Sequence, residues 1–444
     1  MNLKGHFFKP LPQKILPTAV KGAGVYIYDN NGKKYLDGSS GAMTANLGHS
    51  LPEVTEKIKK QLDTLSFVFR HQFNNIFSEE LSQKVASLTP GTLNRVHFVN
   101  SGSEATEFAM KLAKSYWNAL GKNGKHMILS RWLGYHGSTV GALSMTGHVK
   151  RRQPYHHYLS VFPQLETPFC YHCPFEKTHP GCDLFCARQL EKYIDRFGQD
   201  NVSAFIAEPI VGAAGAGITP PDDYFPIIQE ICRKKEVLFI MDEVITGFGR
   251  TGENFACRHW NVQPDIIVFG KGVSSGYIPL AGAVADEKIY EALVEGGADF
   301  STGHTFSGNP LACAAGCAVV DYIVENELVD RARDKGAYLK SSLHQVAREN
   351  DLVGDIRGKG LLFGVELLRD KEKREPYPRE MKITERLVQK CLHNGLVIYP
   401  STGIINGVSG DSVLLAPPLI VTTEELDELV RIFTLSLHQI SQEL

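Results

Sequence analysis

The stretch Asp265-Ile266-Ile267-Val268-Phe269-Gly270-Lys271-Gly272 indicates the fold of this chain. Its four consecutive apolar residues, three of them β-branched, are typical of a strand that is buried on both faces of a sheet. The strand leads to Lys271, and lysine is rarely buried unless it is paired or chemically engaged. Such a lysine can have a lowered pKa and act as a base or Schiff-base nucleophile, although many strands end in a lysine that reaches solvent.

Apolar runs of the same kind recur from about residue 95 and alternate with helical patterns. The runs are 96–99, 127–129, 204–207, 237–241, 266–269 and 281–285, and helical periodicity falls at 104–117 and 224–234. This alternation predicts an α/β domain with a mainly parallel sheet and helices on both faces. Because ligands bind at the carboxyl ends of strands in such sheets, the residues that follow these runs are the candidate site.

The two ends of the chain predict a smaller α+β domain. Asn31-Gly32 between two β-rich runs, 24–28 and 33–37, is typical of a hairpin. Helical patterns follow at 52–63, about 79–88 and 310–324, and strand-like runs at 361–366, 396–399 and 412–416. We predict that residues 1–50 and 321–444 form the small domain and residues 51–320 the large one.

Composition excludes several classes of protein. The 444 residues carry 47 basic and 49 acidic side chains, a formal net charge of −2, so no nucleic-acid partner is expected. No apolar run approaches the roughly 20 residues of a membrane span, and residues 1–10 lack the apolar core of a signal peptide. Nine cysteines, an odd number, do not resemble a secreted disulfide framework. We therefore expect a cytoplasmic protein without a membrane partner.

Four of the cysteines, Cys170, Cys173, Cys182 and Cys186, are closely spaced in a segment rich in proline. The pattern Cys-x2-Cys-x8-Cys-x3-Cys is compatible with a tetrahedral zinc site. The eight-residue gap is short for a zinc ribbon, which favours reduced cysteines with packing roles and no catalytic metal.

Two of the strand ends carry small or aromatic residues. Ser101-Gly102-Ser103 follows the run 96–99 and opens a helix, where backbone N–H groups and the helix dipole favour an anion such as phosphate. Ser103 is also a plausible N-cap, a role that does not exclude phosphate binding. Tyr135-His136 follows the run 127–129, and either ring is able to stack on a planar ligand.

Two other strand ends are acidic. Asp242 follows the run 237–241 and Glu208 follows 204–207. A buried carboxylate must be paired, hydrogen-bonded or protonated, so either a salt bridge or a partner for a protonated ring nitrogen accounts for Asp242. An anion cradle, an acid, an aromatic ring and a lysine are the parts that a pyridoxal 5′-phosphate (PLP) site requires.

The chain resembles the class III (ω-amino acid type) aminotransferases, PLP-dependent enzymes of fold-type I, over nearly its whole length. The motifs that carry the resemblance are 100–105 (Asn-Ser-Gly-Ser-Glu-Ala), 134–137 (Gly-Tyr-His-Gly), Glu208-Pro209, 242–252 (Asp-Glu-Val-Ile-Thr-Gly-Phe-Gly-Arg-Thr-Gly), Lys271-Gly272 and 304–310 (His-Thr-Phe-Ser-Gly-Asn-Pro). The resemblance implies a ping-pong transfer of an amino group from an amine donor to a keto acid acceptor.

The resemblance also implies roles for individual residues. Lys271 would form the Schiff base with PLP and move the proton, and Asp242 would pair with the pyridine nitrogen, with Glu208 in the same acid network. The other contacts to the cofactor would come from Ser101, Gly102 and Ser103 at the phosphate, from Tyr135, Val244 and His136 around the ring, and from Thr305 across a homodimer, so that two subunits share each active site.

The substrates are less well indicated. Relatives that use 2-oxoglutarate often carry glutamine where this chain has Ile245, which favours pyruvate and an ω-amino acid, amine or aminosulfonate donor. The amine–pyruvate subgroup often carries an acceptor-binding arginine near the place of Gly407 or Val408, and this chain lacks it. Arg70 is an alternative cation for the substrate carboxylate; the other interpretation is a surface or interface residue. Met43 and Tyr399 are candidates for lining the substrate pocket; the other interpretation is that they pack in the core.

A 2-oxoglutarate-dependent aminotransferase remains an alternative. A PLP decarboxylase, racemase or aminomutase on the same fold is a further one, because the sequence does not determine which substrate bond lies perpendicular to the ring.

Overall fold

The largest element of the fold is a seven-stranded sheet in the order β4-β10-β9-β8-β7-β5-β6. The computed structural model describes residues 6–8, 14–297 and 302–444. The strands are β4 (Leu93–Val99), β5 (Met127–Arg131), β6 (Gln164–Leu165), β7 (Val202–Ala207), β8 (Leu238–Asp242), β9 (Ile266–Phe269) and β10 (Ala281–Asp286). Only β10 runs against its neighbours among these strands. The predicted α/β domain with a mainly parallel sheet is confirmed.

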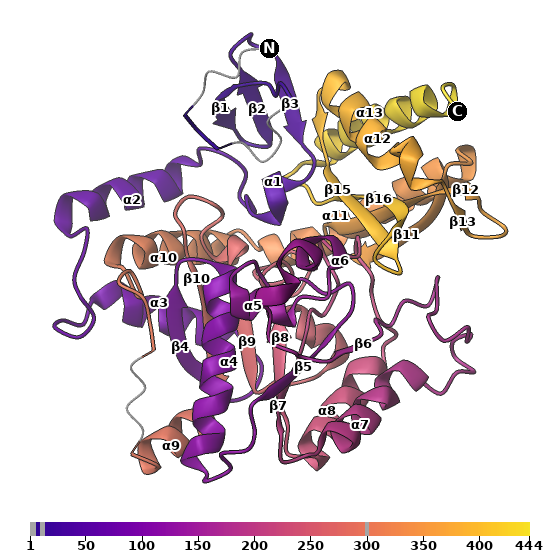
Figure 1. The fold of residues 1–444 in the computed structure, drawn as a ribbon. Helices are drawn as coiled ribbons and strands as arrows, with labels where there is room; N and C mark the ends of the chain where they lie inside the picture. The colour runs from indigo at the N-terminus through magenta and orange to yellow at the C-terminus, as the bar shows by residue number, and fades with distance from the viewer. Residues whose placement is uncertain (1–5, 9–13, 298–301) are drawn as a thin grey trace.

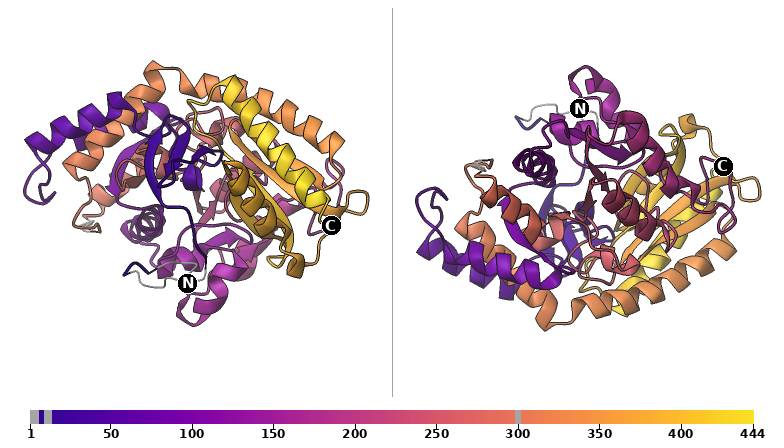
Figure 2. Two further views of the ribbon diagram at one scale, coloured as in Figure 1. Left: turned by 90° about the horizontal axis from the view of Figure 1, so that it is seen from above. Right: turned by 90° about the horizontal axis from the view of Figure 1, so that it is seen from below.

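Helices cover both faces of this sheet (Figures 1 and 2). The helices of this part of the chain are α2 (Pro52–Thr64), α3 (Ile76–Leu88), α4 (Gly102–Ala119), α5 (Val140–Met145), α6 (Val149–Arg152), α7 (Phe185–Phe197), α8 (Tyr224–Lys234), α9 (Glu287–Glu295) and α10 (Pro310–Glu325). Of these, α2 packs on α10 rather than on the sheet. Along β8, Leu238 and Ile240 join the apolar cluster under α4 and α9, whereas Phe239 and Met241 join the larger cluster on the other face. Alternate residues therefore face opposite layers of helices.

Two smaller sheets complete the molecule. One has the order β1-β2-β3-β14, and the other β11-β12-β16-β15, with β13 paired to β12. Their strands are β1 (Ala19–Ala23), β2 (Tyr26–Asp29), β3 (Lys34–Asp37), β11 (Val353–Lys359), β12 (Leu362–Asp370), β13 (Glu375–Pro376), β14 (Leu396–Val397), β15 (Tyr399–Ile405) and β16 (Ser409–Leu415). The accompanying helices are α1 (Ser40–Met43), α11 (Leu328–Glu349), α12 (Ile383–Asn394) and α13 (Thr423–Ser441), and 3-10 helices lie at 153–158, 256–260, 271–273 and 379–381.

The two ends of the chain meet in the first small sheet, because β3 pairs in parallel with β14 and places Leu36 opposite Leu396. Figure 1 shows these N-terminal strands beside α12 and α13. The predicted hairpin is confirmed as β2 and β3, with Tyr26 opposite Leu36. The small domain thus contains residues from both ends of the sequence. The boundaries proposed at residues 50 and 320 stay predictions; the second lies inside α10.

One predicted strand is wrong in extent. The run 396–399 is divided between β14, which pairs with β3, and β15, which pairs with β16 in another sheet. Leu396 and Ile398 are buried and Val397 and Tyr399 are half-buried, so hydrophobicity alone did not reveal the change of partner. No helix in the described parts of the chain is long and apolar enough to cross a membrane.

Candidate active site

A cavity of about 130 Å³ lies beyond the carboxyl ends of β4, β7, β8 and β9. It is lined by Gly102, Ser103, Tyr135, His136, Gly137, Glu208, Asp242, Val244, Ile245 and Lys271. Residues from separate strand ends therefore meet in one place, as the parallel sheet predicts. Gly137 is the one lining residue for which the sequence suggested no role; its position next to Tyr135 and His136 was the available signal.

Lys271 projects into this cavity from the first residue of a 3-10 turn. Its φ of +42° lies in the left-handed region, where a non-glycine residue is strained and is often functional. A side chain at the next residue, Gly272, would come within 2.5 Å of the Asn46 amide nitrogen, so this glycine permits close packing of the N-terminal segment. Burial lowers the pKa of Lys271, and the nearby positive charge of Arg151 acts in the same direction.

Asp242 and Glu243 end on opposite sides of the sheet, as expected for successive residues of a strand. Asp242 lines the cavity, and one of its carboxylate oxygens accepts a hydrogen bond from the Val244 amide at 3.1 Å. Glu243 is fully buried, and it accepts hydrogen bonds from the amides of Ala256 and Cys257, both at 2.7 Å. Asp242 is therefore available to a ligand, whereas Glu243 has a structural role.

His136 holds the other oxygen of Asp242. The distance from His136 Nδ1 to Asp242 Oδ2 is 2.7 Å, and both side chains are buried. Because a carboxylate only accepts, the ring must carry its proton on Nδ1. His136 Nε2 has no hydrogen-bond partner among the described residues. The histidine thus positions the carboxylate beside Lys271.

Glu208 closes the acidic side of the cavity. Its carboxylate accepts hydrogen bonds from the backbone amides of Tyr135 at 2.8 Å and Gly212 at 2.9 Å. Burial raises the pKa of Glu208, and the neighbouring Asp242 carboxylate raises it further. Both carboxylates raise the pKa of Lys271, against the larger effect of burial. The three groups form one electrostatically coupled set.

The N-terminus of the 18-residue helix α4 forms the opposite end of the cavity. Ser101, rather than Ser103, is the N-cap, and its hydroxyl accepts a hydrogen bond from the Glu104 amide at 3.3 Å. The Ser103 hydroxyl lies in the cavity wall and accepts from the Ser138 amide at 3.1 Å. A side chain at Gly102 would come within 3.0 Å of Val244, so glycine leaves the first amides of the helix accessible to an anion.

The remaining predicted residues lie outside this cavity. Met43 is 1% exposed and packs in the larger hydrophobic cluster, and Tyr399 is half-buried in β15. Arg70 donates a hydrogen bond to the Thr302 carbonyl at 3.2 Å and lines a different cavity. Thr305 is exposed on the segment that follows Thr302. Core packing thus accounts for Met43, and Arg70 and Thr305 lie together, apart from the lysine of their own chain.

The cysteines Cys170, Cys173, Cys182 and Cys186 line one small cavity together with the rings of Phe175 and Phe185. All four are free, and burial raises the pKa of Cys186 to about 11 and also raises that of Cys170. Within the described residues, no group of three or more His, Cys, Asp or Glu side chains is arranged to hold a metal ion. The four thiols thus lie together beside aromatic rings.

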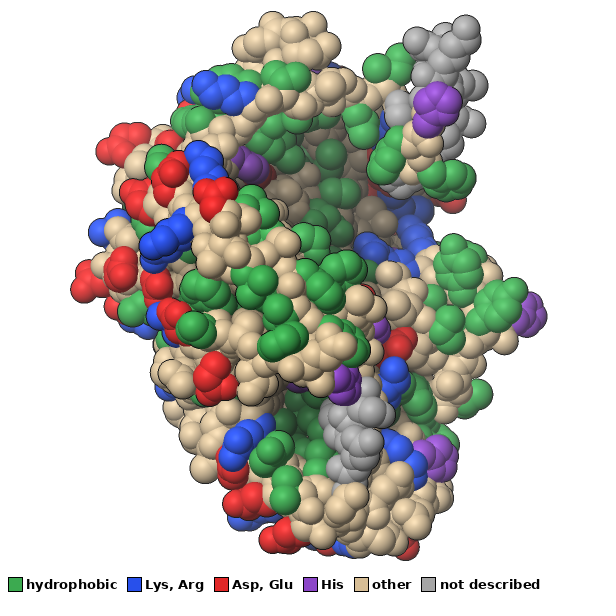
Figure 3. All heavy atoms as spheres, turned by 90° about the vertical axis from the view of Figure 1, so that its left-hand side faces the viewer, with side chains coloured by type: hydrophobic (Ala, Val, Ile, Leu, Met, Phe, Trp, Pro, Cys, Tyr) green, Lys and Arg blue, Asp and Glu red, His purple; other side chains and the backbone are tan. Residues whose placement is uncertain are grey.

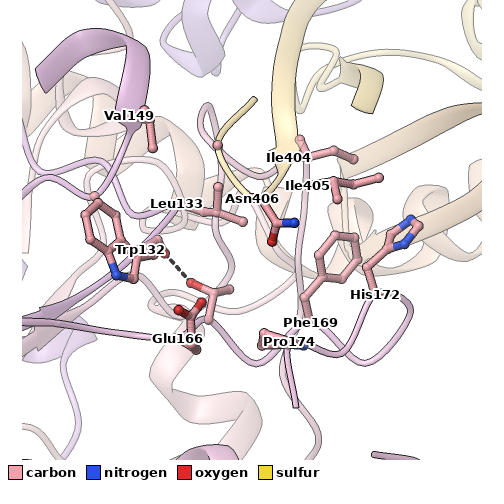
Figure 4. A pocket seen from close by; sticks show the side chains of 13 residues that line it. Trp132, Leu133, Val149, Glu166, Phe169, His172, Pro174, Ile404, Ile405 and Asn406 are labelled. Atoms are coloured by element: carbon pink, nitrogen blue, oxygen red, sulfur yellow. Dashed lines mark hydrogen bonds between the residues drawn. The ribbon is translucent and has the colours of Figure 1, made fainter. Parts of the chain in front are cut away.

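A second cavity, of about 260 Å³, shares no lining residue with the first (Figure 4). Leu133, Phe169 and Ile404 give it apolar walls, and it also contains Glu166, whose pKa is raised by burial. It lies between the segment after β5 and the turn that joins β15 to β16.

Comparison with known proteins identifies the family. Residues 9–437 match the family model described as aminotransferase class-III. The chain is a class III aminotransferase. An uncharacterized aminotransferase, YodT, of Bacillus subtilis is 42% identical over 97% of each chain. The putrescine–pyruvate aminotransferase of Pseudomonas aeruginosa is 34% identical over 95% of this chain and 91% of the relative. The family resemblance seen in the sequence is confirmed.

Solved structures agree with this assignment. An amine transaminase from an uncultivated Pseudomonas species, in its PLP-bound form, has a TM-score of 0.93 at 32% identity and covers 99% of this chain and 100% of its own. The fold is that of fold-type I transaminases, and enzymes of this class depend on PLP. The cavity of the aminotransferase fits that cofactor, because it combines a lysine that lines it, an aspartate held by a histidine and a helix N-terminus with accessible amides.

Proposed function

We propose that the aminotransferase moves an amino group from an ω-amino acid, amine or aminosulfonate donor to a small 2-keto acid, with pyruvate favoured, by a ping-pong mechanism. The observation that carries this choice is the apolar Ile245 in the wall of the cavity, three residues after Asp242, where 2-oxoglutarate-using relatives often carry glutamine. The similarity to a putrescine–pyruvate aminotransferase supports it.

PLP supplies an aldehyde carbon that bonds to an amine and a ring that withdraws electrons from the substrate carbon. Lys271 is the group in the cavity that is able to bond this aldehyde and, once released, to carry a proton at Nζ. Its lowered pKa favours the neutral amine that both tasks need. We propose that Asp242 would pair with the protonated ring nitrogen of the cofactor, because its carboxylate faces the cavity and is held by His136.

The other lining residues bind and orient the cofactor in this proposal. The amides of Gly102 and Ser103, with the helix dipole of α4, hold the phosphate, and Ser101 caps that helix. Tyr135 and Val244 contact the ring, and His136 positions Asp242. Glu208 keeps the loop after β7 in place through its bonds to the amides of Tyr135 and Gly212.

We further propose that the active unit is a homodimer. Seven large hydrophobic side chains near the start of the large domain and on the segment after Thr302 are exposed: Leu62, Leu65, Phe67, Phe69, Phe73, Ile76 and Phe306. The rings of Phe67 and Phe306 lie 5.7 Å apart, and Figure 3 shows hydrophobic side chains gathered on this side of the molecule around a hollow. Such a patch is typical of an interface. Thr305 lies next to Phe306, so the same contact would bring it to the partner's cofactor.

The purified enzyme should be tested with a panel of donors and acceptors. We expect amine-dependent loss of the cofactor absorbance, and its recovery with pyruvate faster than with 2-oxoglutarate. Faster recovery with 2-oxoglutarate would assign the other acceptor. Release of carbon dioxide, racemisation or amino migration without any keto acid would instead assign one of the other PLP reactions.

We also propose that the aminotransferase is located in the cytoplasm. Its nine cysteines are free, which fits the reducing conditions there.

A further inference from the structure

Helix α6 carries three consecutive cations, and two of them have evident structural partners. The Lys150 ammonium donates to the Thr402 hydroxyl at 3.3 Å. The Arg152 guanidinium donates to three backbone carbonyls near the end of α5, at 2.7–3.2 Å. These contacts attach α6 to its surroundings on both sides. They leave Arg151 as the cation whose position needs a different explanation.

Arg151 lies at the edge of the active-site cavity. Its guanidinium carbon is 4.4 Å from the centre of the Tyr135 ring, and Tyr135 lines the cavity that contains Lys271. Across residues 6–8, 14–297 and 302–444, this guanidinium has no ion pair and no hydrogen bond. A guanidinium stacked on an aromatic ring keeps its in-plane N–H groups free to donate. Arg151 therefore presents an unused, planar set of donors beside the site.

The charge of Arg151 acts on the reacting centre. It is among the groups that lower the pKa of Lys271, and it also lowers the pKa of His148, whose value is about 4 chiefly because of burial. An anion that pairs with Arg151 would thus sit close to the lysine that handles the amino group.

The packing of α6 explains why the cation comes from this helix. A side chain at Gly407 would come within 2.2 Å of Val149 Cγ2, and Gly407 has a φ of +73°. The turn between β15 and β16 therefore has no room for an arginine at this position. Figure 4 shows Val149 of α6 on the same cavity as Ile404 at the end of β15 and Asn406 in that turn. Arg151 follows two residues later on the same helix, and its guanidinium lies over the ring of Tyr135, which lines the active-site cavity.

We propose that Arg151 binds the carboxylate of the keto acid acceptor, as a specificity-determining residue of the aminotransferase. The inference rests on the proposed function, because it assumes a small 2-keto acid as the acceptor. A guanidinium binds a carboxylate through two parallel N–H···O bonds, which orients the acceptor as well as attracting it. Arg70, the other candidate, lines a different cavity in its own chain and is able to act only across a dimer.

The test compares acceptors with and without a carboxylate in single half-reactions. The holoenzyme is first loaded with the amino group from an amine donor, and its recovery is then followed with pyruvate and with propanal. We expect Arg151→Gln to raise the half-saturating concentration of pyruvate about 10- to 100-fold, as loss of a charge-assisted pair implies. The half-saturating concentration of propanal should be unchanged. For Arg151→Lys, the half-saturating concentration of pyruvate should lie between those of the wild type and of Arg151→Gln.

Lys150→Gln is the matched control, because it removes a charge from the same helix at a side chain that faces Thr402. It should behave as the wild type with both acceptors. Arg70→Gln tests the other candidate for binding the acceptor carboxylate. A selective loss of pyruvate affinity in that variant and not in Arg151→Gln would overturn the proposal, as would an equal loss for pyruvate and propanal.

A binding measurement makes the inference independent of turnover. Calorimetric titration of the holoenzyme with propionate should show binding that Arg151→Gln weakens by the same factor, whereas propionamide should bind the two proteins equally. If the wild type fails to transfer nitrogen to pyruvate, the proposed function fails, and this titration still decides on Arg151. Propionate affinity that is unchanged in Arg151→Gln would refute its role as the carboxylate site.

Discussion

Lys271 is the residue on which the chemistry depends, and three charged groups around it set its proton affinity. Burial and Arg151 favour the neutral amine, whereas Asp242 and Glu208 favour the ammonium. The net effect is a lowered pKa, so a larger fraction of Lys271 is neutral at a given pH than for an ordinary lysine. A neutral amine is the form that attacks an aldehyde.

We predict that Lys271→Ala keeps its fold and loses turnover by about 1,000-fold or more, because no other amine lines the cavity in the described parts of the chain. Turnover is measured with an amine donor and pyruvate, and folding by thermal unfolding and circular dichroism. Lys122→Ala, which removes an exposed lysine paired with Glu236, is the control and should keep full activity. Sustained multiple turnover by Lys271→Ala would show that the lysine is not required.

The pH dependence of cofactor capture gives a second test at Lys271. We expect the rate at which apoenzyme recaptures PLP to rise with pH and to reach half its maximum below the ordinary pKa of lysine. Removing a positive charge makes the ammonium easier to form, so Arg151→Gln should shift the profile to higher pH. A midpoint at the ordinary lysine value, or a profile that Lys150→Gln shifts as much as Arg151→Gln does, would contradict this account.

At the scale of single elements, the alternation along β8 decides which acidic residue is functional. Leu238 and Ile240 face α4, so Asp242 continues on that side and reaches the cavity. Glu243 faces the other way, where buried amides donate hydrogen bonds to its carboxylate, and its pKa is raised by burial. A slip of one residue in this strand would exchange the two roles.

One buried arginine, Arg250, links segments from the two ends of the chain by hydrogen bonds. Arg250 is fully buried. Its guanidinium donates hydrogen bonds to the Ser40 hydroxyl, the Asn46 side-chain carbonyl and the backbone carbonyls of Leu361 and Pro417, at 2.6–3.1 Å. These partners belong to both ends of the sequence. Arg250 thus attaches the small domain to the strand end that carries Asp242.

We predict that Arg250→Met lowers the free energy of unfolding by about 3 kcal/mol or more, because four buried acceptors lose a charged donor. The urea midpoint and the thermal midpoint measure the loss. Arg95→Met is the control, since Arg95 is exposed and pairs with Glu287 at the surface, and it should cost at most about 1 kcal/mol. Equal losses in the two variants would show that the buried contacts contribute little.

At the scale of the whole molecule, the proposed homodimer would account for the positions of Thr305 and Arg70. Both lie beside the exposed Phe67–Phe306 pair and outside the cavity of Lys271. Thr305 belongs to one of the active-site motifs of the sequence, yet it lies outside the Lys271 cavity of its own subunit. An active site shared between two subunits would explain this position.

A mixing experiment tests the shared site. Lys271→Ala and Thr305→Asp should each be inactive alone, the second because a carboxylate would repel the phosphate. Equal mixtures that exchange subunits should recover about a quarter of wild-type activity, since half of the dimers are mixed and each of these has one intact site. Mixing without recovery, or full activity of Thr305→Asp by itself, would show that each subunit works alone.

The positions of most strands along the chain, the presence of helices between them and the identity of most lining residues follow from local patterns in the sequence. Apolar runs of three to five residues form buried strands wherever they pair, and the residues that follow the parallel strands lie at the same edge of the sheet. Six residues that line the cavity could therefore be predicted together: Lys271, Asp242, Glu208, Gly102, Ser103 and Tyr135. The direction of β10 and the short strand β6 were not predicted, because neither has a local signature.

Long-range packing decided the rest. The bond between His136 and Asp242 joins residues 106 positions apart, and the break between β14 and β15 depends on which sheet offers a partner. In the sequence, Arg151 is one of three consecutive cations, and the tertiary structure is what places its guanidinium over the Tyr135 ring. The sequence by itself determined which chemical groups end the strands, because that depends on local periodicity. Only the tertiary structure decided which cation and which histidine reach them, because contacts between distant segments leave no local pattern.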